Sequence, residues 1–281
     1  MALTQEVYMG VESSGIVVTH DEVGVAHILI DRAEVGNSLS PLARDFLTEA
    51  FRSASGDPAV RAVLLSAAGT RHFCAGAGLA PTDSKSSSYA DQKRRPGDIA
   101  RMLRGGWQAL VTSVLECDKP VIATVKGVAA GAGSSLMLAC DLVVMSTQAT
   151  LVESFVHRGI LPDSGAAYLL TRIVGLRKAT ELLMLGETLD AAACERLGIA
   201  NRVAPVEDVD VIAQDWARRL ASGPTVMLGL TKRLLAVSSE SGRDRALEQE
   251  AWAQEVVSRT EDLQEGLRSF AERRAPRFQG F

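Results

Sequence analysis

The chain has 281 residues, 47% of them hydrophobic, and its 34 acidic and 30 basic side chains give a net charge of −4. This size allows a large buried core, whereas the acidic balance argues against a nucleic-acid-binding surface, which is usually basic. There is no signal-peptide pattern, no apolar stretch long enough to span a membrane, no CxxC pair and no metal-ligand spacing of histidines. We therefore expect a cytoplasmic protein that has no metal site and binds neither nucleic acid nor membrane.

The beginning of the chain alternates strand and helix patterns. Residues 1–14 are polar and aperiodic, and we expect a loose leader there. Residues 23–30 are typical of a strand. Ser40 and Pro41 then supply the N-cap and the first position of a helix. Residues 60–66 predict the next strand.

The middle of the chain continues this alternation, and its end does not. Residues 81–97 are polar and predict a surface loop. Helix and strand patterns follow and indicate repeated β/α units, an α/β core, over residues 15–205. Residues 206–281 predict only helices. The individual predictions are a helix at 99–115, a strand at 120–125, and helices at 211–221, 225–237, 243–258 and 261–273.

Two small-residue turns follow predicted strands, one at residues 75–78 (AGAG) and one at residues 131–133 (GAG), where a helix begins. The first N–H groups of a helix have no intrahelical acceptor, and the helix dipole adds to them, so they stabilise an anionic oxygen. The second turn is neither a phosphate-binding loop nor a complete dinucleotide fingerprint. Close strand–helix packing explains either turn alone equally well, but two such turns could each donate one N–H to a single carbonyl oxygen.

Asp163 lies in the turn of residues 161–165 (LPDSG), just before an apolar helical run. A carboxylate beside oxyanion donors can move a proton next to a carbonyl group. Asp is also favoured as a helix N-cap, so a capping role is the alternative, and the two roles are compatible.

Three motifs, HFCAGAGL (72–79), PVIATVKGVAAGAG (120–133) and GILPDSG (159–165), resemble in order and spacing the crotonase (enoyl-CoA hydratase/isomerase) superfamily. The likeness runs from about residue 23 to residue 281. It implies a spiral of ββα units and a C-terminal helical region that forms a homotrimer, often within a dimer of trimers. It also implies an acyl-CoA thioester as substrate and no separate cofactor, because coenzyme A is part of the substrate.

Carried over motif by motif, the resemblance implies that the Ala77 and Ala132 N–H groups bind the thioester oxygen and that Asp163 is the catalytic acid–base. It implies substrate contacts at Arg32, Glu34, Val35, Ala75, Leu79, Ser135, Phe155, Phe270 and Arg273. For the last two, an exposed basic helix end is an equally good explanation.

The chain departs from the hydratase branch of this family, which carries two glutamates where this sequence has Ser135 and Phe155. Neither residue can activate water. Glu153 lies nearby, and we expect a solvated surface position for it. The single acid Asp163 instead resembles the branch of the 1,2-epoxyphenylacetyl-CoA and Δ3-Δ2 enoyl-CoA isomerases. We therefore expect an isomerase with an enolate intermediate; a hydratase that uses Glu153 or Asp163, and a non-catalytic acyl-CoA binder, are the alternatives.

Overall fold

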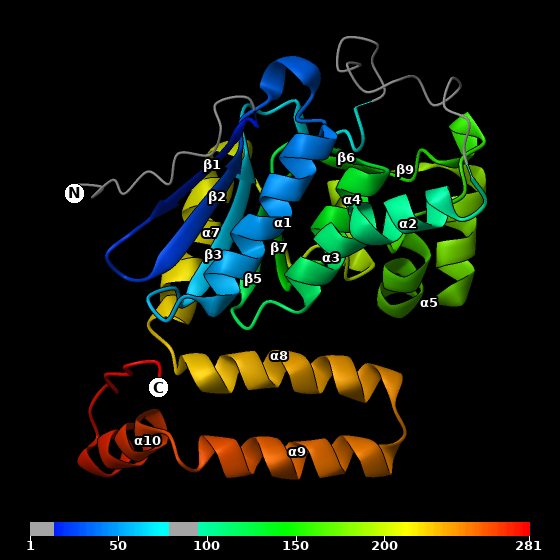
Figure 1. Cartoon of the computed structure of the whole chain (residues 1–281). Coiled ribbons are helices and arrows are strands. Elements are labelled where there is room, and N and C mark those ends of the chain that lie inside the picture. The colour runs from blue at the N-terminus through cyan, green and yellow to red at the C-terminus, as the bar shows by residue number, and fades with distance from the viewer. Residues whose placement is uncertain (1–13, 79–94) are drawn as a thin grey trace.

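The computed structural model describes residues 14–78 and 95–281 (Figure 1). Nearly all of the predicted leader, most of the predicted polar loop and Leu79 lie outside the described residues. The strands are β1 (Ile16–His20), β2 (Val25–Ile30), β3 (Ala62–Ala67), β4 (His72–Cys74), β5 (Val121–Val125), β6 (Val128–Ala130), β7 (Leu142–Ser146), β8 (Thr150–Val152), β9 (Thr188–Asp190) and β10 (Arg202–Ala204). The helices are α1 (Pro41–Gly56), α2 (Asp98–Gly105), α3 (Trp107–Leu115), α4 (Ala132–Leu138), α5 (Ala166–Leu185), α6 (Ala191–Arg196), α7 (Val206–Ala221), α8 (Thr225–Glu240), α9 (Arg243–Val257) and α10 (Glu261–Glu272), with short 3-10 turns η1 (Ala33–Val35) and η3 (Val156–Arg158).

The described strands form two sheets that the chain visits alternately. The larger sheet has the order β1-β2-β3-β5-β7-β10, and the smaller one has the order β4-β6-β8-β9. All pairs are parallel except β1–β2 and β8–β9. Three times in succession a strand of the larger sheet is followed by one of the smaller sheet and then by helical structure. This arrangement confirms the predicted spiral of ββα units.

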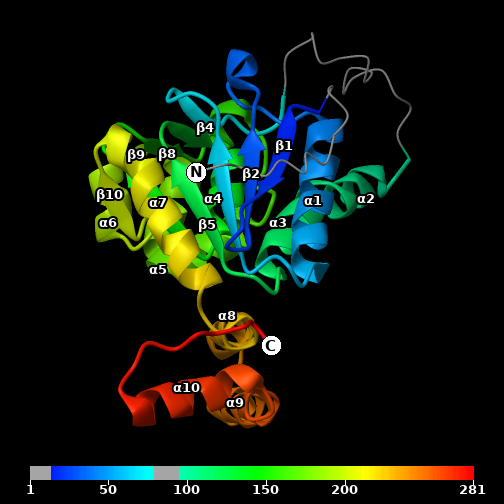
Figure 2. The ribbon, with the colours of Figure 1, turned by 90° about the vertical axis from the view of Figure 1, so that its left-hand side faces the viewer.

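Helices cover both faces of the larger sheet, with α1 and α3 on one face and α7 on the other (Figures 1 and 2). Successive residues of β3 point to opposite faces, as the period of a strand requires. Val63 and Leu65 therefore pack in the core that contains Phe51 of α1, whereas Ala62 and Leu64 pack against α7. The apolar runs predicted as strands are thus buried from both sides.

One local prediction, the start of α1, is confirmed, and another, the single helix at 99–115, is wrong. The Ser40 hydroxyl accepts a hydrogen bond from Ala43 N at 3.2 Å and caps α1, which begins at Pro41. The single helix predicted for residues 99–115 is two helices, because Gly106 (φ −112°, ψ −103°) breaks it. A side chain at Gly106 would crowd the Arg44 guanidinium of α1, so the break lets two helices pack closely. The three-residue strand β6 was not predicted.

Helices α8, α9 and α10 form an arm that extends away from the two sheets (Figure 1). The predicted division at residue 205 stays a prediction; in space, α7 lies against the sheet and the arm begins with α8. Lys232 of α8 fastens the arm through an ion pair with Asp141 (Nζ–Oδ2 2.8 Å) and a hydrogen bond to Val114 O at 2.9 Å. Across residues 14–78 and 95–281, no helix is both long enough and apolar enough to cross a membrane.

Candidate active site

The two small-residue turns, distant in sequence, lie against each other. Gly76 has φ +87°, and a Cβ added to it would lie 3.3 Å from Ala132 N and 3.0 Å from Ala130 O. The first turn is held by Leu39, whose N–H donates to Gly76 O at 2.9 Å. Only a glycine therefore permits both the backbone conformation and the close approach of the second turn.

Both predicted oxyanion donors have an N–H group without an acceptor among the described residues. Ala132 is the first residue of α4, so its N–H cannot bond within the helix. Ala77 lies in the adjacent turn and is exposed. N–H groups without an acceptor in the protein can hold a carbonyl oxygen that gains negative charge.

The start of α4 fits tightly against its surroundings. A Cβ on Gly133 would overlap the Cys74 carbonyl oxygen at the end of β4. Gly131 has φ +54°, and a Cβ there would touch the ring edge of Phe155 at 4.0 Å. Phe155 is 6% exposed and its carbonyl accepts from Ile160 N at 3.1 Å. The ring edge of the predicted substrate residue Phe155 thus lies near the backbone of Gly131.

Asp163 projects from a turn with two successive residues at positive φ, Ser164 at +54° and Gly165 at +81°. The buried Ser164 hydroxyl donates to Asp163 Oδ1 at 2.8 Å and orients the half-buried carboxylate. The alternative N-cap interpretation of Asp163 is wrong, because Gly165 is the N-cap of α5 and Asp163 contributes only its main-chain oxygen to Ala166 N. Positive φ at a serine is strained and is typical of functional sites.

The turn that carries Asp163 lies close to α3, and the helix that follows it, α5, packs against α4. Helix α4 packs against both α3 and α5. A Cβ on Gly165 would lie 3.5 Å from Val111 Cγ1 of α3. Of the large apolar residues nearby, Trp107 of α3 is 8% exposed, whereas Leu161 is 84% exposed. The carboxylate therefore lies in the turn before α5, a helix that contacts α4, which bears Ala132.

Glu153 differs from its prediction: the expected surface position is wrong, and its side chain is fully buried. Its Oε1 lies 2.6 Å from the Ser134 hydroxyl, and its Oε2 has no hydrogen-bond partner. Burial raises the pKa of the Glu153 carboxyl to about 7, and the hydrogen bond with Ser134 opposes this rise. Ser135 is equally buried, with its hydroxyl unpartnered, so its predicted substrate contact stays a prediction.

The N-terminal residues predicted to bind substrate gather around η1. Glu34 and Val35 are exposed there, and Ala75 N donates to Gly36 O at 3.1 Å, which brings Ala75 to the same place. The Arg32 side chain bonds main-chain oxygens, with its Nε 2.9 Å from Ser38 O. Their contacts with a substrate stay predictions.

Asn37 organises this region and was missed in the sequence. Its backbone has φ +55°, and its side chain is buried. The amide Nδ2 donates to Ala68 O at 2.9 Å and to His72 O at 2.8 Å. Oδ1 accepts from Arg32 N at 3.0 Å. Asn37 therefore links the chain after β2 and β3 to the start of β4. The only sign of this in the sequence is the Gly36-Asn37 pair, because both residues tolerate positive φ.

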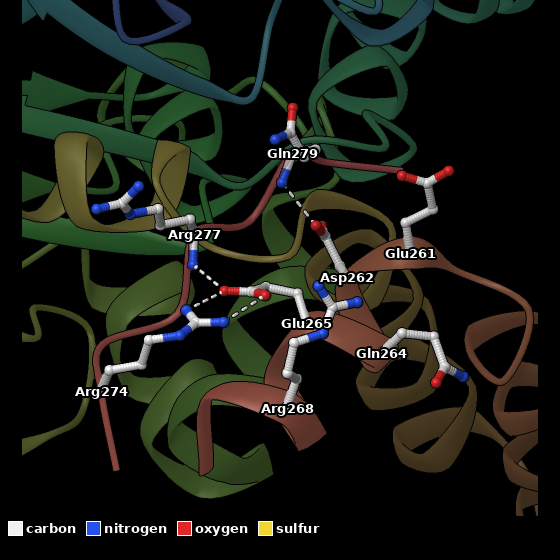
Figure 3. A pocket seen from close by; sticks show the side chains of 8 residues that line it. All are labelled: Glu261, Asp262, Gln264, Glu265, Arg268, Arg274, Arg277 and Gln279. Atoms are coloured by element: carbon white, nitrogen blue, oxygen red, sulfur yellow. Dashed lines mark hydrogen bonds and ion pairs between the residues drawn. The ribbon is translucent and has the colours of Figure 1, made fainter. Parts of the chain in front are cut away.

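The two C-terminal predictions lie on the arm, away from the turns of Ala77 and Ala132 (Figure 1). Phe270 is 85% exposed at the end of α10, and Arg273 follows with φ +56°. A cavity of about 660 Å³ lies between α10 and the C-terminal segment, and neither Phe270 nor Arg273 is among the residues that line it (Figure 3). There Glu265 pairs with Arg274 at 2.6 and 2.9 Å. The residues that line this cavity are polar or charged, some of them pair with one another, and Asp163 is not among them.

In the part of the chain that the structure describes, no three His, Cys, Asp or Glu side chains are grouped to hold a metal ion. The candidate groups described above are two backbone N–H donors and one half-buried carboxylate. Such a set can stabilise an enolate and move a proton.

Comparison with known proteins places this geometry in a family. Residues 20–280 match the family model described as enoyl-CoA hydratase/isomerase. The 1,2-epoxyphenylacetyl-CoA isomerase of Escherichia coli is 33% identical over 264 residues, covering 94% of this chain and 98% of that protein. The (E)-benzylidenesuccinyl-CoA hydratase of Thauera aromatica is 30% identical over 256 residues, 91% of this chain and 96% of that protein.

A solved enoyl-CoA hydratase from Polaromonas sp. JS666 superposes with a TM-score of 0.84 at 31% identity, covering 94% of this chain and 99% of that one. The sequence relatives include both isomerases and hydratases, so they establish the family and leave the individual reaction open. The matched segment spans both small-residue turns and the Asp163 turn. The chain is an enzyme of the enoyl-CoA hydratase/isomerase family, with the crotonase fold.

Proposed function

We propose that this enzyme is an acyl-CoA isomerase in which the Ala77 and Ala132 N–H groups hold the thioester oxygen and Asp163 moves the proton. The observations that support the proposal are the close approach of the two turns at Gly76, where an added Cβ would lie 3.3 Å from Ala132 N, and the lack of an acceptor for the Ala77 and Ala132 N–H groups among the described residues. The E. coli relative, an isomerase by name, supports the choice of reaction.

The chemistry follows from these groups. With a β,γ-unsaturated thioester, the Asp163 carboxylate takes a proton from the α-carbon, and the electron pair moves onto the carbonyl oxygen. The two N–H groups stabilise this enolate, and each such donor contributes about 3 kcal/mol to the transition state in comparable sites. The same carboxyl group returns the proton to the γ-carbon, and the double bond ends between the α- and β-carbons. No proton or water is consumed.

Burial argues against hydration through Glu153. A hydratase needs carboxylates that hold water against the substrate, and Glu153 has no exposed surface. Phe155 offers no polar group in place of the second glutamate. Asp163 is therefore the acid that we assign to the reaction.

We extend the proposal to the surroundings of the reaction. The substrate brings its own coenzyme A, so no cofactor is required, and the η1 region and Ala75 would contact it. The enzyme would work as a homotrimer or a dimer of trimers in the cytoplasm. The four cysteines, all buried as free thiols, support a reducing compartment.

The test is turnover of 3-hexenoyl-CoA and crotonyl-CoA by the wild type and by Asp163→Asn. We expect the wild type to form 2-hexenoyl-CoA, and the variant to lose about 10³-fold in kcat while binding the thioester with unchanged Kd, because only proton transfer is removed. Hydration of crotonyl-CoA without a double-bond shift would instead make the enzyme a hydratase. Absence of turnover with retained binding would make it a non-catalytic binder.

A further inference from the structure

The Ser134 hydroxyl lies between two oxygen atoms. Its Oγ is 2.7 Å from Gly131 O and 2.6 Å from Glu153 Oε1. A hydroxyl has one proton to donate, whereas a carbonyl and an ionised carboxylate both only accept. With Glu153 ionised, one of these short contacts would join two acceptors. With Glu153 protonated, both are hydrogen bonds: the carboxyl donates to Ser134, and Ser134 donates to Gly131 O.

The surroundings of Glu153 favour the neutral form. The side chain has no exposed surface, and it forms no ion pair with any residue in the described ranges. Its second oxygen, Oε2, has no partner. An unpaired buried charge is unfavourable, so a neutral carboxyl is the stable form there. The raised pKa of about 7 agrees with this reasoning.

The Gly131 carbonyl oxygen, which accepts the last of these two hydrogen bonds, belongs to the proposed oxyanion site. The Gly131 carbonyl and the Ala132 N–H belong to one peptide unit. A hydrogen bond to the carbonyl polarises the amide and strengthens its N–H as a donor. Gly131 also holds an uncommon conformation (φ 54°, ψ −123°), and its oxygen accepts from Ser134 N at 3.0 Å and Ser135 N at 3.2 Å. The orientation of the Ala132 N–H thus depends on what bonds Gly131 O.

We propose that protonated Glu153 is a positioning residue, which acts through Ser134 on the Gly131–Ala132 peptide and so fixes and strengthens the Ala132 N–H as an oxyanion donor. This inference rests on the proposed function only in the role given to Ala132. Glu153 touches no substrate; its effect passes entirely through Ser134.

Three variants separate the loss of the hydrogen bond from Glu153 to Ser134 from the loss of side-chain packing at Glu153. Glu153→Met fills the space without a donor, Glu153→Gln keeps an amide that can donate to Ser134, and Ser134→Ala removes the link. We expect Glu153→Met and Ser134→Ala to lower kcat for 3-hexenoyl-CoA about tenfold with KM little changed, because a strengthened donor acts mainly in the transition state. Glu153→Gln should restore most of the loss. The double variant Glu153→Met/Ser134→Ala should have the same kcat as Ser134→Ala alone, because both substitutions break the same series of hydrogen bonds.

Two infrared measurements test the inference without turnover. The first is the difference spectrum between the wild type and Glu153→Gln at mildly acidic pH, which should contain a carboxylic acid carbonyl band. The second is the carbonyl stretch of bound hexanoyl-CoA, isotope-labelled at its carbonyl. Relative to free hexanoyl-CoA, we expect this stretch to shift to lower frequency when bound to the wild type. The shift should be smaller in Glu153→Met and close to that of the wild type in Glu153→Gln. Circular dichroism confirms that each variant is folded.

The outcomes are distinguishable. A carboxylate band in place of the acid band overturns the inference whatever the reaction of the enzyme. An equal carbonyl shift in the wild type and Glu153→Met overturns it while leaving the proposed function intact. Failure of hexanoyl-CoA to bind the wild type overturns the proposed function and the inference together.

Discussion

The two small-residue turns meet at Gly76. Because glycine has no side chain, the space beside Ala132 N stays open. Gly76→Ala should lower kcat at least about 100-fold, because the new methyl group lies against the donor peptide. Gly198→Ala is the matched control: Gly198 has φ +74°, similar to the +87° of Gly76, but nothing within 4 Å of the added Cβ. The control should lose about 1 kcal/mol of stability and keep its activity. Equal activities of the two variants would contradict this role for Gly76. Turnover assays and urea unfolding make the comparison.

The buried carboxyl of Glu153 predicts a particular pH dependence of stability. Its pKa is raised from 4.5 to about 7 in the folded state, so between these pH values the folded chain holds a proton that the unfolded chain has lost. The wild type should therefore lose stability relative to Glu153→Gln as the pH rises through this window, by on the order of 3 kcal/mol in total. Urea unfolding of both proteins across the window measures it. Parallel curves would show that Glu153 titrates normally in the folded state.

At this scale, the sequence predicted residues whose role is local. The start of α4 could be predicted because a strand, a glycine turn and a helix follow one another within about a dozen residues, whereas Ala132 itself was named from the family resemblance. The burial of Glu153 could not be predicted, because it depends on the start of α4 lying over the segment after β8, which is a tertiary arrangement. Asn37 was missed for the same reason, since its partners Ala68 and His72 lie beyond the next helix and strand.

At the scale of elements, predictability follows length. Helix α1 has a cap, a proline and several turns of periodic apolar residues, and its ends were predicted closely. Strands β4, β6, β8 and β9 have three residues each, too few for a period to show, and form only because the spiral brings them together. The break between α2 and α3 falls at Gly105 and Gly106, a pair that is visible in the sequence but was read as part of one helix.

The contact between α4 and the end of β4 has no room for a methyl group. Gly133→Ala would drive its Cβ into the Cys74 carbonyl oxygen, and main chain cannot rotate away as a side chain can. We expect a loss of about 3 kcal/mol in the free energy of unfolding and reduced activity, because the helix that carries Ala132 must shift. Gly56→Ala, at a helix end with nothing within 4 Å, should leave both unchanged or slightly improved. Thermal unfolding of the two variants would contradict the prediction if their midpoints matched.

At the scale of the whole molecule, Lys232 is one of the groups that fasten the arm to the core. Lys232→Met should remove about 2 kcal/mol of stability, because Asp141, whose side chain is 27% exposed, would lose its cation. The arm should also become more susceptible to limited proteolysis. Lys126→Met, which breaks a more exposed pair with Asp210, is the control and should cost less than about 1 kcal/mol. Equal losses in urea unfolding would mean that Lys232 does not anchor the arm.

Arg61 attaches the other end of the arm, and most of its acceptors are main-chain atoms. Its guanidinium donates to Gly223 O at 2.7 Å and Phe278 O at 3.2 Å, and Lys232 likewise donates to Val114 O. Carbonyl oxygens are present whatever amino acid occupies these positions. Substitutions on the outer surfaces of α9 and α10 can therefore change the exposed side chains of the arm without removing the acceptors that attach it to the two sheets.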